Sequence, residues 1–175
     1  MNKTLVIFYS YTGTSRRVAQ LLCSQLGWPS GEILEANPRA GVLGTLRCLA
    51  DSMLRLKPLI NYRGPDPKAF DTVVLVSPIW AYRLGGPMRT FVANHRAGLR
   101  QVAVLSVMGA YGAPNAVAEI GELLGRAPVL ASAFTSREVD DGSCAARLEA
   151  FGRAVQDARE DAPPVRQAQL SPRAA

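Results

Sequence analysis

The sequence has little of what metal centres and disulfide frameworks require. Its 175 residues include one histidine and three cysteines. The cysteines Cys23, Cys48 and Cys144 are odd in number, lie far apart and form no Cys-x-x-Cys pair. A single histidine also excludes a multi-histidine metal centre. We therefore expect no metal ion and three ordinary thiols.

Long apolar runs are also absent. No run approaches the length of about 18 residues that a membrane-spanning helix needs, and Leu5–Tyr9 is too short for the core of a signal peptide. We expect a cytoplasmic protein without a membrane span. A hydrophobic fraction of 48% fits one globular domain, which we place at residues 1–159. The segment 160–175 has no apolar period and is expected to be a flexible tail.

Negative charge is scarce in two stretches of a chain whose net charge is +6. Residues 39–68 include six basic and two acidic side chains, and residues 83–100 include four arginines and no carboxylate. Either these stretches form solvated faces, or they form a positive surface that steers an anionic substrate or an acidic protein. The basic residues are dispersed, so no nucleic-acid partner is expected.

What the chain does have is a regular alternation of strand-like and helix-like segments. Apolar and β-branched runs predict strands at residues 3–9, 32–35, 72–77, 101–108 and 129–134. Helical periodicity with proline and glycine boundaries predicts helices at 14–26, 87–97, 114–124 and 143–157. This alternation favours an α/β fold, in which helices cover both faces of a parallel sheet and the crossovers are right-handed.

One segment, about 38–68, is too long for a simple connection between strands. Apolar residues at helical spacing over Leu43–Leu56 predict an amphipathic helix, and Pro58–Pro67 is expected to be extended. The helix covers either the sheet or a partner's surface, and the sequence leaves both open.

The loop after the first strand combines small and hydroxylic residues. It reads Ser10-Tyr11-Thr12-Gly13-Thr14-Ser15, and a helical pattern follows at once. A helix N-terminus exposes unpaired N–H groups to an anion. The hydroxyls could donate to phosphate, and Gly13 permits close approach. Because the loop has neither a lysine nor Gly-x-Gly-x-x-Gly, a terminal monophosphate is favoured. The alternative is an ordinary capped helix, which would need only one hydroxyl.

Two further loops should meet this one at the carboxyl ends of the strands. They span 77–86 and 106–113, and they carry Trp80, Tyr82 and Tyr111 between small residues. Such aromatic side chains could flank a flat ring. The alternative is that Trp80 only plugs the end of the sheet. Arg83 follows closely, and we hypothesise that it faces the ring or an incoming anion.

Together the three loops resemble those of the flavodoxin family, whose members bind FMN. Tyr-Ser-Tyr-Thr-Gly-Thr-Ser resembles its phosphate loop, Ser-Pro-Ile-Trp-Ala the loop with the ring-stacking tryptophan, and Gly-Ala-Tyr-Gly the third flavin loop. The resemblance covers residues 3–157. It implies a flavodoxin-like doubly wound five-stranded parallel sheet of order 2-1-3-4-5, with FMN at its carboxyl edge. The cofactor-binding residues it implies are Ser10, Thr12, Gly13, Thr14 and Ser15 for the phosphate, Pro78, Ile79, Trp80 and Ala81 for the isoalloxazine, and Gly109, Tyr111 and Gly112 for its other side.

The chain differs from electron-carrier flavodoxins in two respects. Those proteins are usually acidic, whereas this chain is basic. They also usually place glycine where a peptide flip stabilises the one-electron form of the flavin, and the nearest residues here are Ala81 and Tyr82. Because positive φ is costly without glycine, we expect such a flip to be less favourable.

The resemblance implies an FMN-binding redox protein. It would act as an NAD(P)H-dependent quinone or FMN reductase, or in electron transport to a partner protein. No catalytic side chain is expected, because the flavin supplies the chemistry. The alternative is a non-redox binding module with an empty or adapted site. A phosphatase is disfavoured, since residues 10–15 include no Asp or Cys nucleophile. The oligomeric state is left open.

Overall fold

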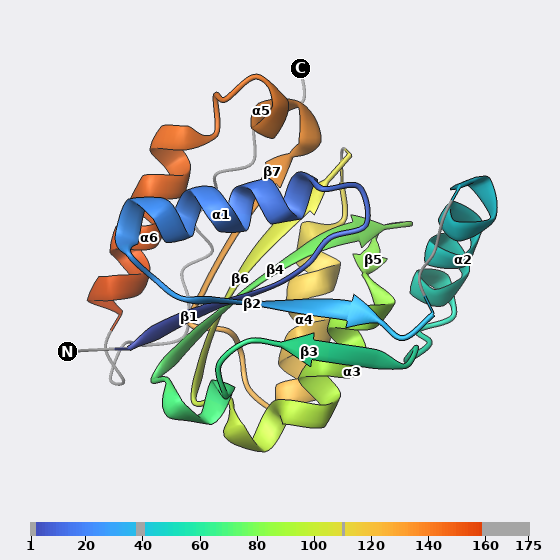
Figure 1. Ribbon diagram of the computed structural model, residues 1–175, viewed down its shortest axis with the longest axis horizontal. Coiled ribbons are helices and arrows are strands. Elements are labelled where there is room, and N and C mark those ends of the chain that lie inside the picture. Colours follow the sequence, from blue (N-terminus) through green and yellow to red (C-terminus); the bar gives the residue numbers. More distant parts are fainter. Residues whose placement is uncertain (1–2, 38–40, 110, 159–175) are drawn as a thin grey trace.

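The computed structural model describes residues 3–37, 41–109 and 111–158, which form one sheet flanked by helices (Figure 1). The strands are β1 (Thr4–Tyr9), β2 (Ser30–Glu35), β3 (Ile60–Arg63), β4 (Thr72–Trp80), β5 (Arg83–Leu84), β6 (Gln101–Met108) and β7 (Leu130–Thr135). The helices are α1 (Thr14–Leu26), α2 (Gly41–Met53), α3 (Gly86–His95), α4 (Ala113–Leu124), α5 (Ser136–Asp140) and α6 (Ala145–Asp157), with 3-10 turns η1 (Pro67–Ala69) and η2 (Arg96–Gly98). The tail predicted at 160–175 lies outside the described residues.

The sheet confirms the predicted fold class. Its order is β3-β2-β1-β4-β6-β7, with β5 paired to β4. The five strands β2, β1, β4, β6 and β7 are parallel neighbours, which is the predicted order 2-1-3-4-5. Two antiparallel strands were not predicted. The edge strand β3 is only four residues long and lies in the segment expected to be merely extended, and β5 has two residues.

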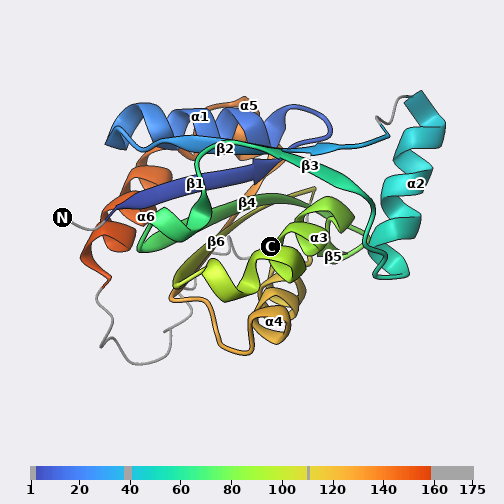
Figure 2. The same ribbon diagram turned by 60° about the horizontal axis from the view of Figure 1, so that its bottom comes forward.

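Successive residues of the central strands point to opposite faces, and each face has its own core. Leu5 and Ile7 of β1 join the core beneath α3 and α4, with Phe91 and Ile120 among its members. Val6 and Phe8 join the other core, beneath α1 and α6. The view in Figure 2 separates these two helical layers on either side of the sheet. Burial on both faces explains why the strand sequences are nearly continuous apolar runs.

The helix α2 stands at one end of the molecule, beside the strand ends and the start of α3 (Figures 1 and 2). A buried guanidinium fastens it there. Arg89 of α3 donates from Nη1 to the carbonyls of Asp51 at 3.0 Å and Leu56 at 2.8 Å, and from Nη2 to the carbonyl of Leu84 at 2.9 Å. Its Nε pairs with the Glu119 carboxylate of α4. One side chain therefore joins α2, β5, α3 and α4.

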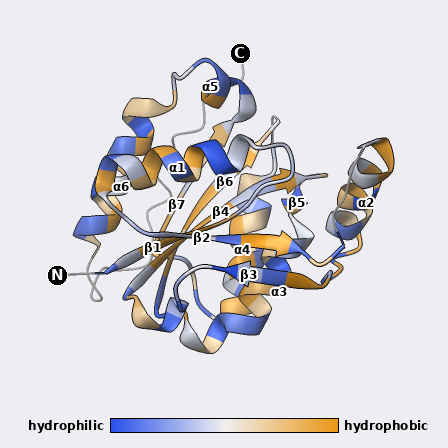
Figure 3. Ribbon diagram, in the orientation of Figure 1, coloured by the Kyte–Doolittle hydropathy of each residue, from blue (hydrophilic) through white to orange (hydrophobic). Residues whose placement is uncertain are grey.

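This burial corrects the interpretation of the arginines at 83–100 as solvated or steering for Arg89 alone, because Arg96 and Arg100 are exposed. Arg89 is 2% exposed and Glu119 is 5% exposed, so Arg89 contributes to the core and not to a positive surface. The sequence could not reveal the pair, because Glu119 lies 30 residues away on another helix. The helix α2 differs from the buried pair in having apolar residues at the surface, and Figure 3 shows the apolar colour along much of this helix.

Candidate functional site

The loop between β1 and α1 leaves the N-terminus of α1 without a side-chain cap. Gly13 is the N-cap residue with φ of 94°, a left-handed conformation that favours glycine, and none of the described side chains caps this end. The first turn has no acidic residue. The first N–H groups of α1 therefore point out of the helix unpaired, and the alternative that the hydroxyls merely cap the helix is wrong.

Ser10 makes a hydrogen bond within the loop that still leaves its own hydroxyl proton able to donate. Its Oγ accepts a hydrogen bond from the Gly13 N–H at 3.1 Å, which closes the loop ahead of the helix. Thr12 and Thr14 have their hydroxyl oxygens 3.4 Å apart, and Ser15 is buried at 2% exposure. Thr12, Thr14 and Ser15 therefore lie at the N-terminal end of α1.

A cavity of about 380 Å³ opens beside this helix end. Most of the expected cofactor residues line it: Thr12, Thr14, Ser15, Pro78, Ile79, Trp80, Ala81, Gly109 and Tyr111. Its lining also includes Tyr82, Val107, Met108 and Ser136. Ser10, Gly13 and Gly112 are not part of the lining. The structure therefore brings the three predicted loops to one site.

The loop after β4 is a two-residue hairpin turn. Trp80 pairs with Arg83, and between them Ala81 has φ of 47° and Tyr82 has φ of 63°. These are the signs that a type I′ turn requires, normally with glycine or asparagine. We expected positive φ to be costly at these two residues, and both adopt it.

Neighbouring residues of α4 and its preceding loop hold that turn in place. Asn115 donates from Nδ2 to the Tyr82 carbonyl at 3.1 Å. Gly112 has φ of 112°, and a Cβ there would lie 2.6 Å from the Cα of Tyr82. Gly112 therefore acts as the close-approach point for the turn and does not form the wall of the cavity.

Trp80 belongs to the cavity wall and to an aromatic contact. Its ring lies edge-on to Tyr11, with centroids 5.8 Å apart and planes at 72°. The indole Nε1 is buried and has no acceptor among the described residues. The Tyr11 hydroxyl in turn donates to the Gly41 carbonyl at 3.1 Å and lies 3.4 Å from the Thr45 Oγ1. The loop between β1 and α1 is thereby connected to α2.

Arg83 lies on the other side of the hairpin turn from the cavity. It lines a neighbouring groove of about 680 Å³ together with Arg55, Tyr82 and Glu122, and Arg55 approaches Glu122 at 3.6 Å. Because Arg83 is not part of the cavity lining, the hypothesis that it faces a ring there has no support. The alternative, a contact with an incoming anion, fits its place in the groove.

Ser136 reaches the cavity because a capping box fixes the start of α5. Thr135 and Glu138 exchange hydrogen bonds between side chain and backbone. Burial opposes ionisation of Glu138, but hydrogen bonds from Thr135 and the Arg147 guanidinium hold the pKa of its carboxyl below the usual range.

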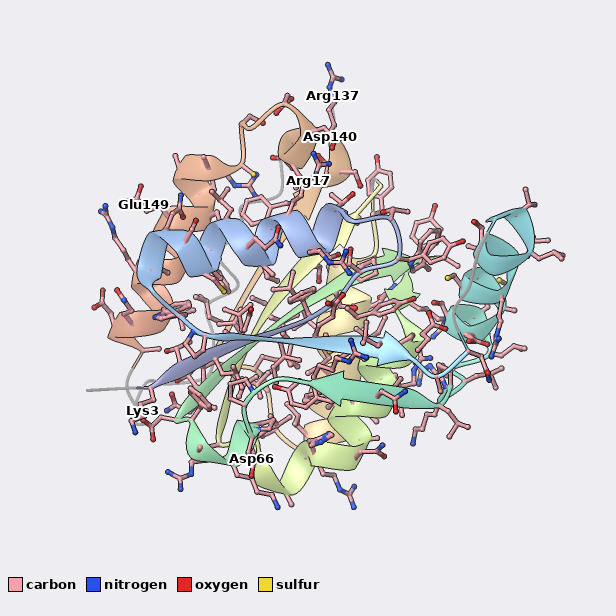
Figure 4. All side chains as sticks on the ribbon, viewed as in Figure 1. Lys3, Arg17, Asp66, Arg137, Asp140 and Glu149 are labelled. Carbon is pink, nitrogen blue, oxygen red and sulfur yellow. The ribbon has the colours of Figure 1, made fainter. Side chains whose placement is uncertain are left out.

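A second contact joins α5 to α1. Arg17 of α1 and Asp140 of α5 point toward one another (Figure 4) and form an ion pair.

Two negative findings complete the site. No group of three His, Cys, Asp or Glu side chains that could hold a metal ion occurs within 3–37, 41–109 and 111–158. In the same part of the chain, no helix has the length and hydrophobicity to cross a membrane.

Comparison with solved structures identifies the fold. A flavoprotein from Lactobacillus acidophilus NCFM in complex with FMN is similar with a TM-score of 0.67 and 21% identity, over 82% of this chain and 99% of that one. The apo form of that flavoprotein has a TM-score of 0.57 at 19% identity, over 80% and 96%. A flavodoxin from Streptococcus pneumonia TIGR4 has a TM-score of 0.51 at 14% identity, over 88% and 97%. No protein-family model and no curated protein gives a match. The chain has a flavodoxin-like fold.

Proposed function

We propose that this chain binds FMN in the cavity and transfers electrons through it. The observation that carries the proposal is the uncapped N-terminus of α1, which opens into the same cavity as Trp80 and Tyr111. A phosphate site and a pair of aromatic rings at one cavity suit a phosphorylated ring cofactor. The similar flavoprotein from Lactobacillus acidophilus NCFM, which was solved with FMN, supports the same cofactor.

The residues present fit a monophosphate. Thr12, Thr14 and Ser15 would donate hydroxyl hydrogen bonds, and the exposed N–H groups of the first turn of α1 would supply the remaining donors. A volume of about 380 Å³ lies within the range of about 300–1,000 Å³ typical of small-molecule sites. The unpartnered Trp80 Nε1 is a buried donor at the cavity wall, a feature common at ligand sites.

Bound FMN would supply the redox chemistry, and the protein would orient it. Ile79 and Trp80 would exclude water from the inner wall, while Tyr82 and Tyr111, 59% and 61% exposed, would cover the mouth. No side chain is assigned to proton transfer.

The fixed hairpin turn favours two-electron chemistry over one-electron shuttling. Rotation of the peptide after Tyr82 would break the hydrogen bond from Asn115 to the Tyr82 carbonyl, and Gly112 leaves the turn no space to move toward α4. We therefore infer a reductase that takes electrons from NAD(P)H and gives them to a quinone-like acceptor. Electron transport to a partner protein is the second form of this proposal.

Substitution of Thr14 tests the phosphate assignment. An aspartate at the first residue of α1 favours the helix dipole and so preserves folding, but its charge repels phosphate. We expect Thr14→Asp to weaken FMN binding about a hundredfold or more and to leave riboflavin, which has no phosphate, nearly unaffected. Titration monitored by flavin fluorescence measures both affinities. Thr14→Ser keeps the hydroxyl and serves as the matched control.

Equal losses for FMN and riboflavin would place the phosphate elsewhere. A protein that quenches neither flavin would instead favour the non-redox binding module. Anaerobic stopped-flow mixing of the FMN-loaded protein with NADPH then separates the two redox forms. Rapid bleaching of the flavin supports a reductase, and a flavin that stays oxidised supports a carrier that needs a protein donor.

A further inference from the structure

The helix α2 docks on the body with its small and polar residues and presents its large apolar residues outward. Its buried members are Gly44, Cys48, Asp51 and Ser52. On the opposite face, Val42, Leu46 and Met53 are 78%, 55% and 63% exposed. An ordinary surface helix has the reverse arrangement, with its apolar face on the core. The outward face of α2 is therefore built for contact with something else.

The exposed apolar surface extends beyond the helix. Leu43 on α2 is 80% exposed, and Leu54, Leu56 and Leu59 after it are 68%, 46% and 76% exposed. Monomeric proteins rarely expose a contiguous group of this size without a function. We define the α2 face as Val42, Leu43, Leu46, Met53, Leu54, Leu56 and Leu59.

Both ends of α2 are fastened, so its apolar face is held outward. Near the N-terminal end, the Tyr11 hydroxyl donates to the Gly41 carbonyl. Near the C-terminal end, Arg89 donates to the carbonyls of Asp51 and Leu56. Figure 2 shows the helix at one end of the molecule, with its C-terminal end beside α3 and β5.

The exposed charges on α2 and the residues directly after it are positive. Arg47, Arg55 and Lys57 are exposed, and the only acidic residue between 41 and 65, Asp51, is 6% exposed. Among the described residues, Arg47 and Lys57 have no ion-pair partner, and Arg55 approaches Glu122 at 3.6 Å. Aliphatic side chains flanked by cations are the pattern of a helix that lies on an anionic lipid surface.

Two other occupants fit these observations less well. A second copy of the chain would bring the same cations against one another across a two-fold axis. Tryptophan and tyrosine often carry the binding energy of a protein interface, whereas the α2 face has no aromatic residue. We propose that the α2 face binds the surface of a membrane that contains anionic phospholipids.

Co-sedimentation with vesicles tests this proposal. The full chain should bind vesicles of phosphatidylcholine mixed with phosphatidylglycerol, and should bind pure phosphatidylcholine much more weakly. Binding should fall as salt is raised. The double change Arg47→Gln/Lys57→Gln should weaken binding about thirtyfold, since two cations leave the lipid surface. Leu43→Ser/Leu46→Ser should weaken it at least as much.

Matched changes elsewhere serve as controls. Leu21→Ser removes a partly exposed leucine from α1, and Arg137→Gln removes an exposed cation from α5. Both should leave vesicle binding unchanged. Circular dichroism and thermal unfolding should show that every variant is folded, because all of the changed side chains are exposed.

Failure of the full chain to bind anionic vesicles would overturn the proposal, as would equal binding to both lipid compositions. A concentration-dependent dimer in sedimentation equilibrium that is lost in Leu43→Ser/Leu46→Ser, without vesicle binding, would overturn it in favour of a second copy. None of these outcomes depends on FMN binding.

Discussion

Gly112 illustrates how one residue positions another loop of the site. With φ of 112° and Tyr82 Cα 2.6 Å from the place of a Cβ, it has no space for a side chain. The sequence pattern Gly-Ala-Tyr-Gly placed Gly112 at a flavin, and the structure places it against the hairpin turn. A glycine signal shows that space is needed, but not for which neighbour.

We predict that Gly112→Ala destabilises the protein by about 1–3 kcal/mol, because it combines a strained φ with a backbone clash. Gly109→Ala is the matched control, since a Cβ at Gly109 has no atom within 4 Å. Urea unfolding measures both free energies. Equal effects of the two substitutions would contradict the assigned contact with Tyr82.

Glu138 gives the site a measurable pH dependence. Its pKa is lowered in the folded chain from an ordinary value of 4.5, because bonds from Thr135 and Arg147 outweigh burial. A lowered carboxyl pKa means that its stabilising effect is full above about pH 4.5 and is lost as the pH falls through the folded pKa.

We therefore predict that Glu138→Gln is less stable than the parent near neutral pH by about 1 kcal/mol, and that the difference vanishes in acid. Urea unfolding at a series of pH values gives the two stability curves. Parallel curves down to acid pH would refute the assignment, because only a titrating Glu138 makes them converge.

At the scale of elements, long periodic segments were predicted well and short ones were not. The helix at 14–26 and the strand at 101–108 match α1 and β6 at both ends. The apolar residues of α1 follow one helical period, and β6 is a continuous apolar run that is buried on both faces. The helix α5 and the strands β3 and β5 have two to five residues. Segments of that length carry too little periodicity to predict, and tertiary contacts such as the Arg17–Asp140 pair position them.

Arg89 determines how four of these elements fit together. We predict that Arg89→Met destabilises the protein by about 3–5 kcal/mol, because it leaves Glu119 buried and unpaired. The double change Arg89→Met/Glu119→Leu should recover much of that loss, since no charge then remains in the core. Chemical unfolding of the single and double variants forms the test, and additive losses would mean that the two residues are not coupled.

At the scale of the whole molecule, the sequence predicted which three loops meet at the cavity, but not the residues that hold those loops in place. The hydroxyl-rich loop and the aromatic loops could be found because residue types cluster there. Val107 and Met108 line the cavity, but in the sequence they look like ordinary core residues of β6. Asn115 supports the site only through its hydrogen bond to the Tyr82 carbonyl. Contacts of this kind depend on the packing of distant segments, so no local pattern predicts them.

The exposure of the α2 face is also a property of the whole molecule, because it depends on how α2 packs on the other elements. The periodicity over Leu43–Leu56 indicated an amphipathic helix and left its partner open. Only the folded structure shows that the small residues Gly44 and Cys48 of α2 are buried against the rest of the protein. A sequence pattern gives the apolar side of a helix, whereas the tertiary fold decides whether that side is covered.

FMN binding is tested most directly by titrating the purified chain, stripped of any bound cofactor, with FMN while the flavin fluorescence and absorption are recorded. We predict saturable quenching at one FMN per chain and a perturbed flavin spectrum, because the ring enters a cavity walled by Trp80 and Tyr111. Unchanged fluorescence of the added FMN would contradict it.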